Sequence, residues 1–181
     1  MNNQNYYPII LQKNTVMSSH ENFLFRISTI DYQDFSCVLR ITKKKSGRLL
    51  PIEKGLKKDG SSYRIEDQCA TIAELNNFAV SDKRSLYTVW KLLLSIINKE
   101  NIDKLYCLVD PENRFTNSFY SDLGFKNSEQ YNELIIFPTY GKVINNVFIP
   151  SKWKILVIED TQKMAKVLPV NQLPVNQLNK I

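Results

Sequence analysis

Two side chains in this sequence are of types that carry out acid–base chemistry, and both stand in segments with a strong structural pattern. Tyr120 follows Phe119 near the end of NRFTNSFYSDLGF, residues 113–125, and Glu74 stands in CATIAELNNFAV, residues 69–80. A positioned phenol can protonate a leaving group, and a carboxylate can take a proton from a nucleophile. The two residues are therefore candidates for a general acid and a general base.

Each candidate also has a structural interpretation that the residues alone leave open. Tyr120 can be a core aromatic, and we expect its neighbours Phe119 and Phe125 to be core residues. Glu74 alternates with Leu75 on a predicted strand, so its carboxylate is expected to point either into a cleft or into solvent. An exposed Glu74 without a role in chemistry is as consistent with the pattern as a base.

The apolar periodicity predicts the elements that position these residues. Residues 69–80 alternate as a half-buried strand, and the apolar positions of residues 86–97 recur at the three- and four-residue spacing of an amphipathic helix. KLYCLVD, residues 104–110, is a short apolar run typical of a strand covered on both faces. Residues 113–123 then form a helix that ends at Gly124, a residue that readily takes a left-handed cap.

The segments before this unit are less regular. Residues 22–30 and 35–42 alternate apolar and polar side chains, which favours an antiparallel hairpin, although a cap at Asp31 and a helix over residues 32–40 also fit. Residues 43–68 are rich in Lys and Gly and are interpreted as a basic surface loop, with one helical turn possible around IEKGLKK.

The expected organisation is one domain over residues 23–160, between a flexible leader, residues 1–22, and a flexible tail, residues 161–181. The leader is polar and Asn-rich, with one short strand at most, and the tail carries the pentapeptide LPVNQ twice. Two further strands, residues 132–138 and 152–159, complete the domain. This order predicts an α/β fold in which helices cover a sheet.

Composition limits the classes of function. The net charge of +6 and the pI of about 9.1 suit an acidic partner or substrate, and no run approaches the ~18 apolar residues of a membrane span, so we expect a soluble, cytoplasmic protein. Cys37, Cys69 and Cys107 lack metal-ligand or disulfide spacing, and His20 has no ligand-forming neighbour, so no metal site is expected. No nucleic-acid motif interleaves aromatic and basic residues, so no nucleic-acid partner is expected.

The stretch around Tyr120 resembles the helix-and-turn signature of the GNAT acyltransferases. Asn113, Thr116, Phe119 and Tyr120 stand at that family's spacings before Leu-Gly-Phe at residues 123–125, with Thr116 where the family commonly has Ala. AELNNFAV is similar to the family's central strand. The resemblance covers residues 72–137 best and implies a GNAT-like, mostly antiparallel sheet flanked by helices.

The resemblance implies transfer of an acyl group, acetyl or longer, from acyl-CoA or an acyl carrier protein to a primary amine of a small molecule or peptide. Tyr120 would be the general acid and Glu74 the base, and direct attack is implied because no Cys or Ser stands beside a His that could activate it. The positions expected to hold the carrier are Phe78, Ala79, Val80, Arg84, Ser85, Leu86, Tyr87, Thr88 and Asn113.

The segment expected to hold the carrier's phosphates departs from the family. Family members that bind coenzyme A usually have glycines there, whereas KRSLYTVW has none and no glycine lies between Gly60 and Gly124. Arg84, Ser85 and Thr88 still offer a cation and two hydroxyls at a helix start. A non-catalytic binding module with this fold is therefore an alternative to an enzyme.

In this departure the chain resembles a GNAT-related branch, the acyl-homoserine-lactone and N-acyl amino acid synthases. The shared features are an LR strand, an LP element and E-x-x-x-F-x-V, here Glu74 to Val80, whereas Asn77 stands where that branch has Arg. Many of these enzymes take the acyl chain from acyl carrier protein, which is acidic. The basic segment from Lys43 to Lys58 would suit such a carrier.

Overall fold

The computed structural model describes residues 9–17, 21–29, 35–43 and 48–167, and the side chains of some residues within these ranges are not described. The elements are β1 (Ile9–Met17), β2 (Glu21–Thr29), β3 (Phe35–Lys43), β4 (Arg48–Leu56), β5 (Ser62–Asp67), β6 (Thr71–Val80), α1 (Lys83–Lys99), β7 (Lys104–Val109), α2 (Arg114–Asp122), β8 (Lys126–Asn127), β9 (Ile135–Ile144), β10 (Val147–Ile158) and α3 (Thr161–Val167).

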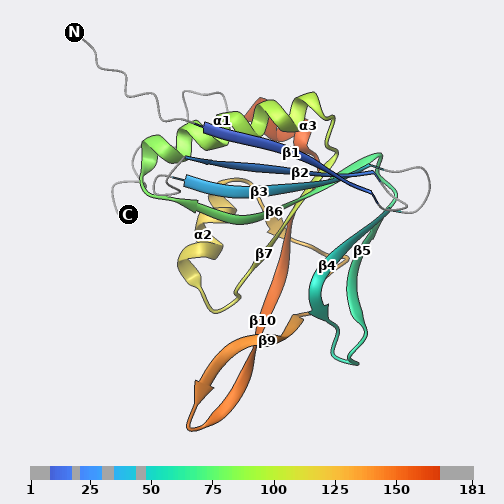
Figure 1. Cartoon of the computed structure of the whole chain (residues 1–181), viewed down its shortest axis with the longest axis vertical. Helices are drawn as coiled ribbons and strands as arrows, with labels where there is room; N and C mark the ends of the chain where they lie inside the picture. Colours follow the sequence, from blue (N-terminus) through green and yellow to red (C-terminus); the bar gives the residue numbers. More distant parts are fainter. Residues whose placement is uncertain (1–8, 18–20, 30–34, 44–47, 168–181) are drawn as a thin grey trace.

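The strands form one sheet in the order β1-β2-β3-β6-β7-β10-β9-β4-β5, with the short β8 beside β10 (Figure 1). Among the pairs in the described ranges, β6 and β7 are parallel and every other pair is antiparallel. The parallel pair follows from the α1 crossover, since a parallel connection needs a helix-length segment to return the chain. The predicted fold class, an α/β fold with a mostly antiparallel sheet flanked by helices, is confirmed.

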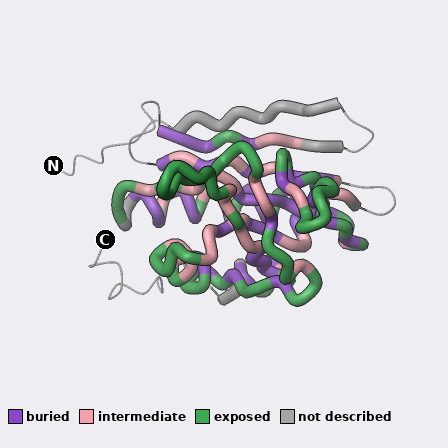
Figure 2. The backbone as a smooth tube through the Cα atoms, turned by 90° about the horizontal axis from the view of Figure 1, so that it is seen from below, coloured by how far each residue is buried: buried purple, intermediate pink, exposed green. Residues whose placement is uncertain are grey.

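Apolar side chains on the two faces of the sheet form two separate cores. All three helices contribute to the first core, which includes Ala73 and Leu75 of β6 and Trp90 of α1. The second core lies on the other face, where the β4–β5 hairpin and β9 cover Ile72 of β6 and Tyr106 of β7. The alternation along β6 therefore sends successive side chains to opposite cores. In Figure 2, seen from below, the parts of the chain nearest the viewer are largely exposed, and buried backbone lies behind them.

Several local predictions are confirmed. β2 and β3 pair antiparallel, as the hairpin interpretation of residues 22–42 requires, and the alternative helix over residues 32–40 is wrong because residues 35–40 lie in β3. The predicted helix over residues 86–97 is α1, and KLYCLVD provides β7 beside β6. The predicted helix over residues 113–123 is α2.

The predicted basic loop is wrong over most of its length. β4 and β5 form an antiparallel hairpin, and no helical turn forms around IEKGLKK, which lies mainly in β4. Tyr63, Ile65 and Asp67 are buried while the residues between them are exposed, so β5 has a clear period of two. β5 itself has no lysine or glycine, but it follows a stretch rich in both, and its packing on the second core fixes it as a strand.

Both ends of the chain differ from the expected leader and tail. Residues 9–17 form β1, which pairs with β2 over its whole length, and β2 begins at Glu21. Thr161–Val167 forms α3, and Thr161 and Met164 are buried. The remaining residues of the predicted leader and tail lie outside the described ranges.

The last two strands are longer than the sequence pattern predicted. β9 extends to Ile144 and β10 begins already at Val147, so that their hairpin projects well beyond the body of the molecule (Figure 1). Across the Pro150–Ser151 bond the partner of β10 changes from Gly141 to Phe137, which leaves three β9 residues bulged out. None of the helices in the described ranges combines the length and apolar character needed to cross a bilayer.

Candidate functional site

The central parallel pair separates partway along its length. β6 and β7 pair from Ile72 and Lys104 up to Leu75 and Cys107, while β6 itself continues to Val80. On its other side, β6 advances three residues, from Asn76 to Ala79, while β3 advances only two. This extra residue is a β-bulge, which bends the strand that carries it.

Asn77 lies in this bulge with a positive φ of 51°. Among residues other than glycine, Asn is one of the few that take this left-handed conformation at low cost. The sequence therefore supports the bend at this position. The bend in β6 leaves a cleft between β6 and β7.

The cleft is a cavity of about 520 Å³. Side chains from β6, β7, α2 and the β9–β10 hairpin line it, so it has contributors on both faces of the sheet. The lining residues are Leu75, Asn76, Asn77, Phe78, Leu108, Thr116, Tyr120, Phe137, Tyr140 and Trp153. Most of these side chains are apolar or aromatic, and the size suits an organic ligand.

α2 brings Tyr120 to this cleft. The Asn113 side chain caps the helix by accepting a hydrogen bond from the Thr116 N–H at 3.1 Å, and Gly124 ends it with a φ of 95°. Phe125 is buried in the first core and Phe119 packs against it, so the prediction that these two residues are core aromatics is confirmed.

Tyr120 is 6% exposed, and its ring contacts those of Phe78, Phe119 and Phe125 at centroid distances of 6.4, 5.5 and 5.3 Å. Burial raises the pKa of the Tyr120 hydroxyl, so the group stays protonated throughout the neutral range. Tyr120 thus combines the position of a core residue with a protonated phenol in the cavity wall.

Glu74 is next in sequence to Leu75, which lines the cavity, but Glu74 itself is not part of the lining. It is 3% exposed, so neither an exposed nor a cleft-lining carboxylate is observed. Its Oε2 atom lies 3.8 Å from Nη1 of Arg40, the residue that pairs with Glu74 across β3 and β6. This Oε2 atom has no hydrogen-bond partner. Burial raises the pKa of Glu74, and the Arg40 guanidinium and the Asn76 amide oppose that rise only in part.

Arg40 connects Glu74 to the β4 segment. Its guanidinium donates to the Pro51 carbonyl at 3.2 Å and to Glu53 Oε2 at 3.3 Å. Glu53 is mostly exposed, whereas Glu74 is buried. One cation is thus shared between two carboxylates, so Glu74 is only partly neutralised.

The start of α1 is already occupied by a carboxylate of the protein. Asp82 caps the helix, and its Oδ1 atom accepts a hydrogen bond from the Ser85 N–H at 2.8 Å. Ser85 and Leu86 are buried and Thr88 is half-buried. A bound anion at this helix start would compete with Asp82 for the Ser85 N–H, and it would lie beside the negative charge of the Asp82 carboxylate.

The structure brings together only part of the predicted site. Phe78 and Tyr120 share the cavity, as do Asn76 and Asn77, the polar neighbours of Glu74. Ala79 is exposed and Val80 packs against the first core, while Asn113 serves as the cap of α2. The side chains of Arg84 and Tyr87 lie outside the described part of the chain.

Three aromatic residues of the cavity were not found from the sequence. Phe137 lies 6.2 Å from Trp153 and 6.4 Å from Tyr140, measured between ring centroids. They come from the β9–β10 hairpin, and the bulge opposite Pro150 and Ser151 includes Tyr140. Their aromatic character was visible, but only the pairing of β10 with β7 brings this hairpin to the cleft.

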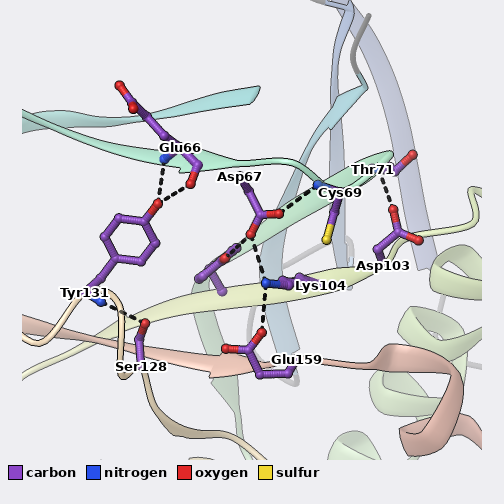
Figure 3. Close-up of polar contacts among 10 residues, drawn as sticks. Glu66, Asp67, Cys69, Thr71, Asp103, Lys104, Ser128, Tyr131 and Glu159 are labelled. Atoms are coloured by element: carbon purple, nitrogen blue, oxygen red, sulfur yellow. Dashed lines mark hydrogen bonds and ion pairs between the residues drawn. The ribbon is translucent and has the colours of Figure 1, made fainter. Parts of the chain in front are cut away.

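A second polar cluster lies away from the cleft and joins β5 to β7 (Figure 3). Asp67 accepts hydrogen bonds from the Tyr106 hydroxyl at 2.6 Å and the Cys69 N–H at 2.8 Å. It also pairs with Lys104 at 3.1 Å, which in turn reaches Glu159 at 2.9 Å. The acceptor atoms of Asp67 are satisfied within the protein, which indicates a structural role.

Comparisons with known proteins place few limits on this chain. No protein-family model matches the sequence, and no curated protein sequence matches it. Among solved structures it is similar to FeeM, an N-acyl amino acid synthase from uncultured soil microbes, with a TM-score of 0.37 and 11% sequence identity. The alignment covers 90% of this chain and all of FeeM. A similarity of this size carries no conclusion about activity.

Proposed function

We propose that this protein transfers an acyl group from a pantetheine thioester to a primary amine. The observation that carries the proposal is the cavity at the point where the parallel strands separate, with the buried, protonated Tyr120 in its wall. Because side chains from both faces of the sheet line the cavity, it offers room for a thioester and an amine to meet beside Tyr120.

The reaction is a direct displacement. The nitrogen of the neutral amine attacks the thioester carbonyl carbon, a C–N bond forms, and the C–S bond breaks. Tyr120 gives its proton to the departing thiolate, and the proton that the newly bonded nitrogen loses passes through solvent and restores the Tyr120 hydroxyl. The phenol is suited to this role because its burial keeps it protonated before the reaction.

Glu74 is the proposed base. An ammonium must lose a proton before attack, and Glu74 has a partly neutralised carboxylate with an oxygen that accepts no hydrogen bond. Since Glu74 lies beside the cavity, the proton would pass through a water next to Asn76, which lines the cavity and perturbs the pKa of Glu74.

We further propose that the donor is an acyl carrier protein with an acyl chain longer than acetyl, as in the acyl-homoserine-lactone and N-acyl amino acid synthases. Asp82 disfavours a pyrophosphate at the start of α1, whereas a carrier protein presents pantetheine on a single phosphate. The aromatic side chains of Phe137, Tyr140 and Trp153 offer a long acyl chain an apolar wall.

Replacing Tyr120 with Phe tests the proposal, because it removes only the hydroxyl. We expect the turnover number to fall by a factor of ~10² with the melting temperature retained. Tyr140→Phe is the matched control, since Tyr140 lines the same cavity but is 57% exposed, and its turnover should stay near wild type. Equal turnover of Tyr120→Phe and wild type at saturating substrates would assign Tyr120 to the core alone.

A further inference from the structure

The end of the β9–β10 hairpin carries an exposed apolar surface, which we call the hairpin tip. Its turn is Asn145–Asn146, and both residues have positive φ, 51° and 64°, as a two-residue turn of type I′ requires. Large apolar side chains surround this turn. They are Val143, 68% exposed, Ile144, 44%, Val147, 61%, Phe148, 47%, and Ile149, 39%.

The apolar side chains of the tip occupy both faces of the two-stranded ribbon. Phe148 lies opposite Val143, and Val147 lies opposite Ile144 in the next register position. Successive positions of a strand point to opposite faces, so these two pairs project in opposite directions. A flat protein partner would cover one pair and leave the other in water, whereas the acyl region of a lipid layer surrounds an inserted tip on all sides.

A basic turn accompanies the tip. Lys57 and Lys58 are exposed in the turn between β4 and β5, together with Asp59, and Lys54 is exposed in β4 beside Glu53. Leu56, the last residue of β4 before the turn, pairs with Ile136 near the start of β9, so the β4–β5 turn lies beside the base of the β9–β10 hairpin. Figure 1 shows both hairpins projecting in the same direction, with the β9–β10 hairpin reaching further.

We propose that this end of the protein binds an anionic lipid surface, with the hairpin tip inserted among the lipids and the β4–β5 turn facing the headgroups. An apolar tip and nearby cations supply the two contributions that hold a peripheral protein on a membrane. The chain's net charge of +6 favours the same surface. This proposal concerns a binding surface and does not depend on the proposed acyl transfer.

Two other occupants fit the observations less well. An acidic carrier protein would explain the lysines but would leave an apolar pair of the tip uncovered. A second copy of this chain would bring two basic turns together and would repel itself at low salt.

Sedimentation of the full-length protein with vesicles tests the proposal. We expect binding to vesicles of phosphatidylcholine mixed with phosphatidylglycerol, and weaker binding to phosphatidylcholine alone or at high salt. The double variants Val143→Ser with Phe148→Ser, and Lys57→Glu with Lys58→Glu, should each lower the partition coefficient on the mixed vesicles at least about tenfold.

Matched controls use exposed residues on other elements. Phe115→Ser, at a residue 60% exposed on α2, should bind as wild type, and so should Arg26→Glu, at an exposed residue of β2. All variants change exposed side chains and should keep the wild-type melting temperature. Absence of binding to the mixed vesicles, or equal binding by the tip variant, would overturn the proposal. The proposal would also be overturned if the protein did not bind vesicles but formed a dimer that the tip substitutions dissociate.

Discussion

At the scale of single residues, the most consequential side chain is Glu74. It is a carboxylate in the interior of a sheet, with one guanidinium shared between it and Glu53. Burial raises the pKa of Glu74 more than Arg40 lowers it. Its native pKa therefore lies above the unfolded value, so this group adds full stability below the unfolded pKa and loses that contribution as the pH rises through the folded pKa.

Glu74→Gln should remove this loss, because an amide does not ionise. We expect the melting temperature of the variant to be close to wild type in acid and to exceed it increasingly as the pH rises to neutral, while turnover falls. The measurement is a series of thermal unfolding curves from acid to neutral pH. Glu53→Gln is the control, since Glu53 is largely exposed, and it should show little pH-dependent difference. A wild type that gains stability over the variant towards neutral pH would contradict a raised pKa.

A second residue-scale prediction concerns Asp82, which caps α1. Asp82→Ser keeps a capping oxygen but removes the charge from the helix start. If the phosphates of free acyl-CoA approach this helix, the variant should bind acyl-CoA about two- to fivefold more tightly than wild type, as the 0.3–1 kcal/mol typical of such charge effects implies. Calorimetric titration measures it. Asp160→Ser makes the same change at α3, where Asp160 accepts from the Gln162 N–H, and should leave the affinity unchanged.

At the scale of elements, the β4–β5 hairpin is held on the second core by Asp67. Burial opposes ionisation of this carboxyl most strongly, but its contacts with Cys69, Tyr106 and Lys104 outweigh burial and lower the pKa of Asp67 to about 2. The stability that Asp67 contributes is thus present above the unfolded pKa of about 4 and lost as the pH falls towards 2.

Asp67→Asn should therefore lower the free energy of unfolding by roughly 1–3 kcal/mol at neutral pH. The difference from wild type should shrink in acid, where the wild-type carboxylate also takes up a proton. Denaturant titrations at neutral and acid pH measure both values. Glu159→Gln removes the exposed partner of Lys104 and should cost much less. A difference that is the same at both pH values would mean that the charge of Asp67 is unimportant.

α3 is the second element whose contribution can be measured. Met164 packs in the first core, and Thr161 donates from its N–H to the Asp103 carbonyl at 3.1 Å and from its hydroxyl to the Ile102 carbonyl. Truncation after Thr161 removes Met164 and should lower the melting temperature by roughly 5 °C or more. Truncation after Val167 keeps α3 and is the control. Equal losses from both truncations would show that α3 adds nothing.

At the scale of the whole molecule, the excess of positive charge bears on the choice of acyl donor. An acidic carrier protein gains from the net charge of +6 at longer range than a small thioester does. We therefore expect acyl carrier protein to bind more tightly than free acyl-CoA at low ionic strength. The preference should shrink as salt screens the attraction. Titrating both donors at low and high salt tests this, and tighter binding of acyl-CoA under both conditions would rule out the carrier-protein proposal.

The sequence predicted the elements whose signals are local. α1, α2 and β7 were visible because periodicity, capping residues and short apolar runs act within a few residues. The left-handed end of α2 followed from Gly124 alone. β4 and β5 were missed because they belong to a lysine- and glycine-rich stretch that is typical of a surface loop, and their strand structure depends on packing against a distant core.

The same division holds for the site. The sequence by itself determined that Tyr120 stands at the end of a capped helix and that Glu74 stands on the strand preceding the crossover. Only the tertiary structure decided that β6 bends away from β7, that the β9–β10 aromatics close the cavity, and that Asp82 occupies the helix start. These features depend on pairing between segments far apart in the chain, and their register is set by the packing of whole faces.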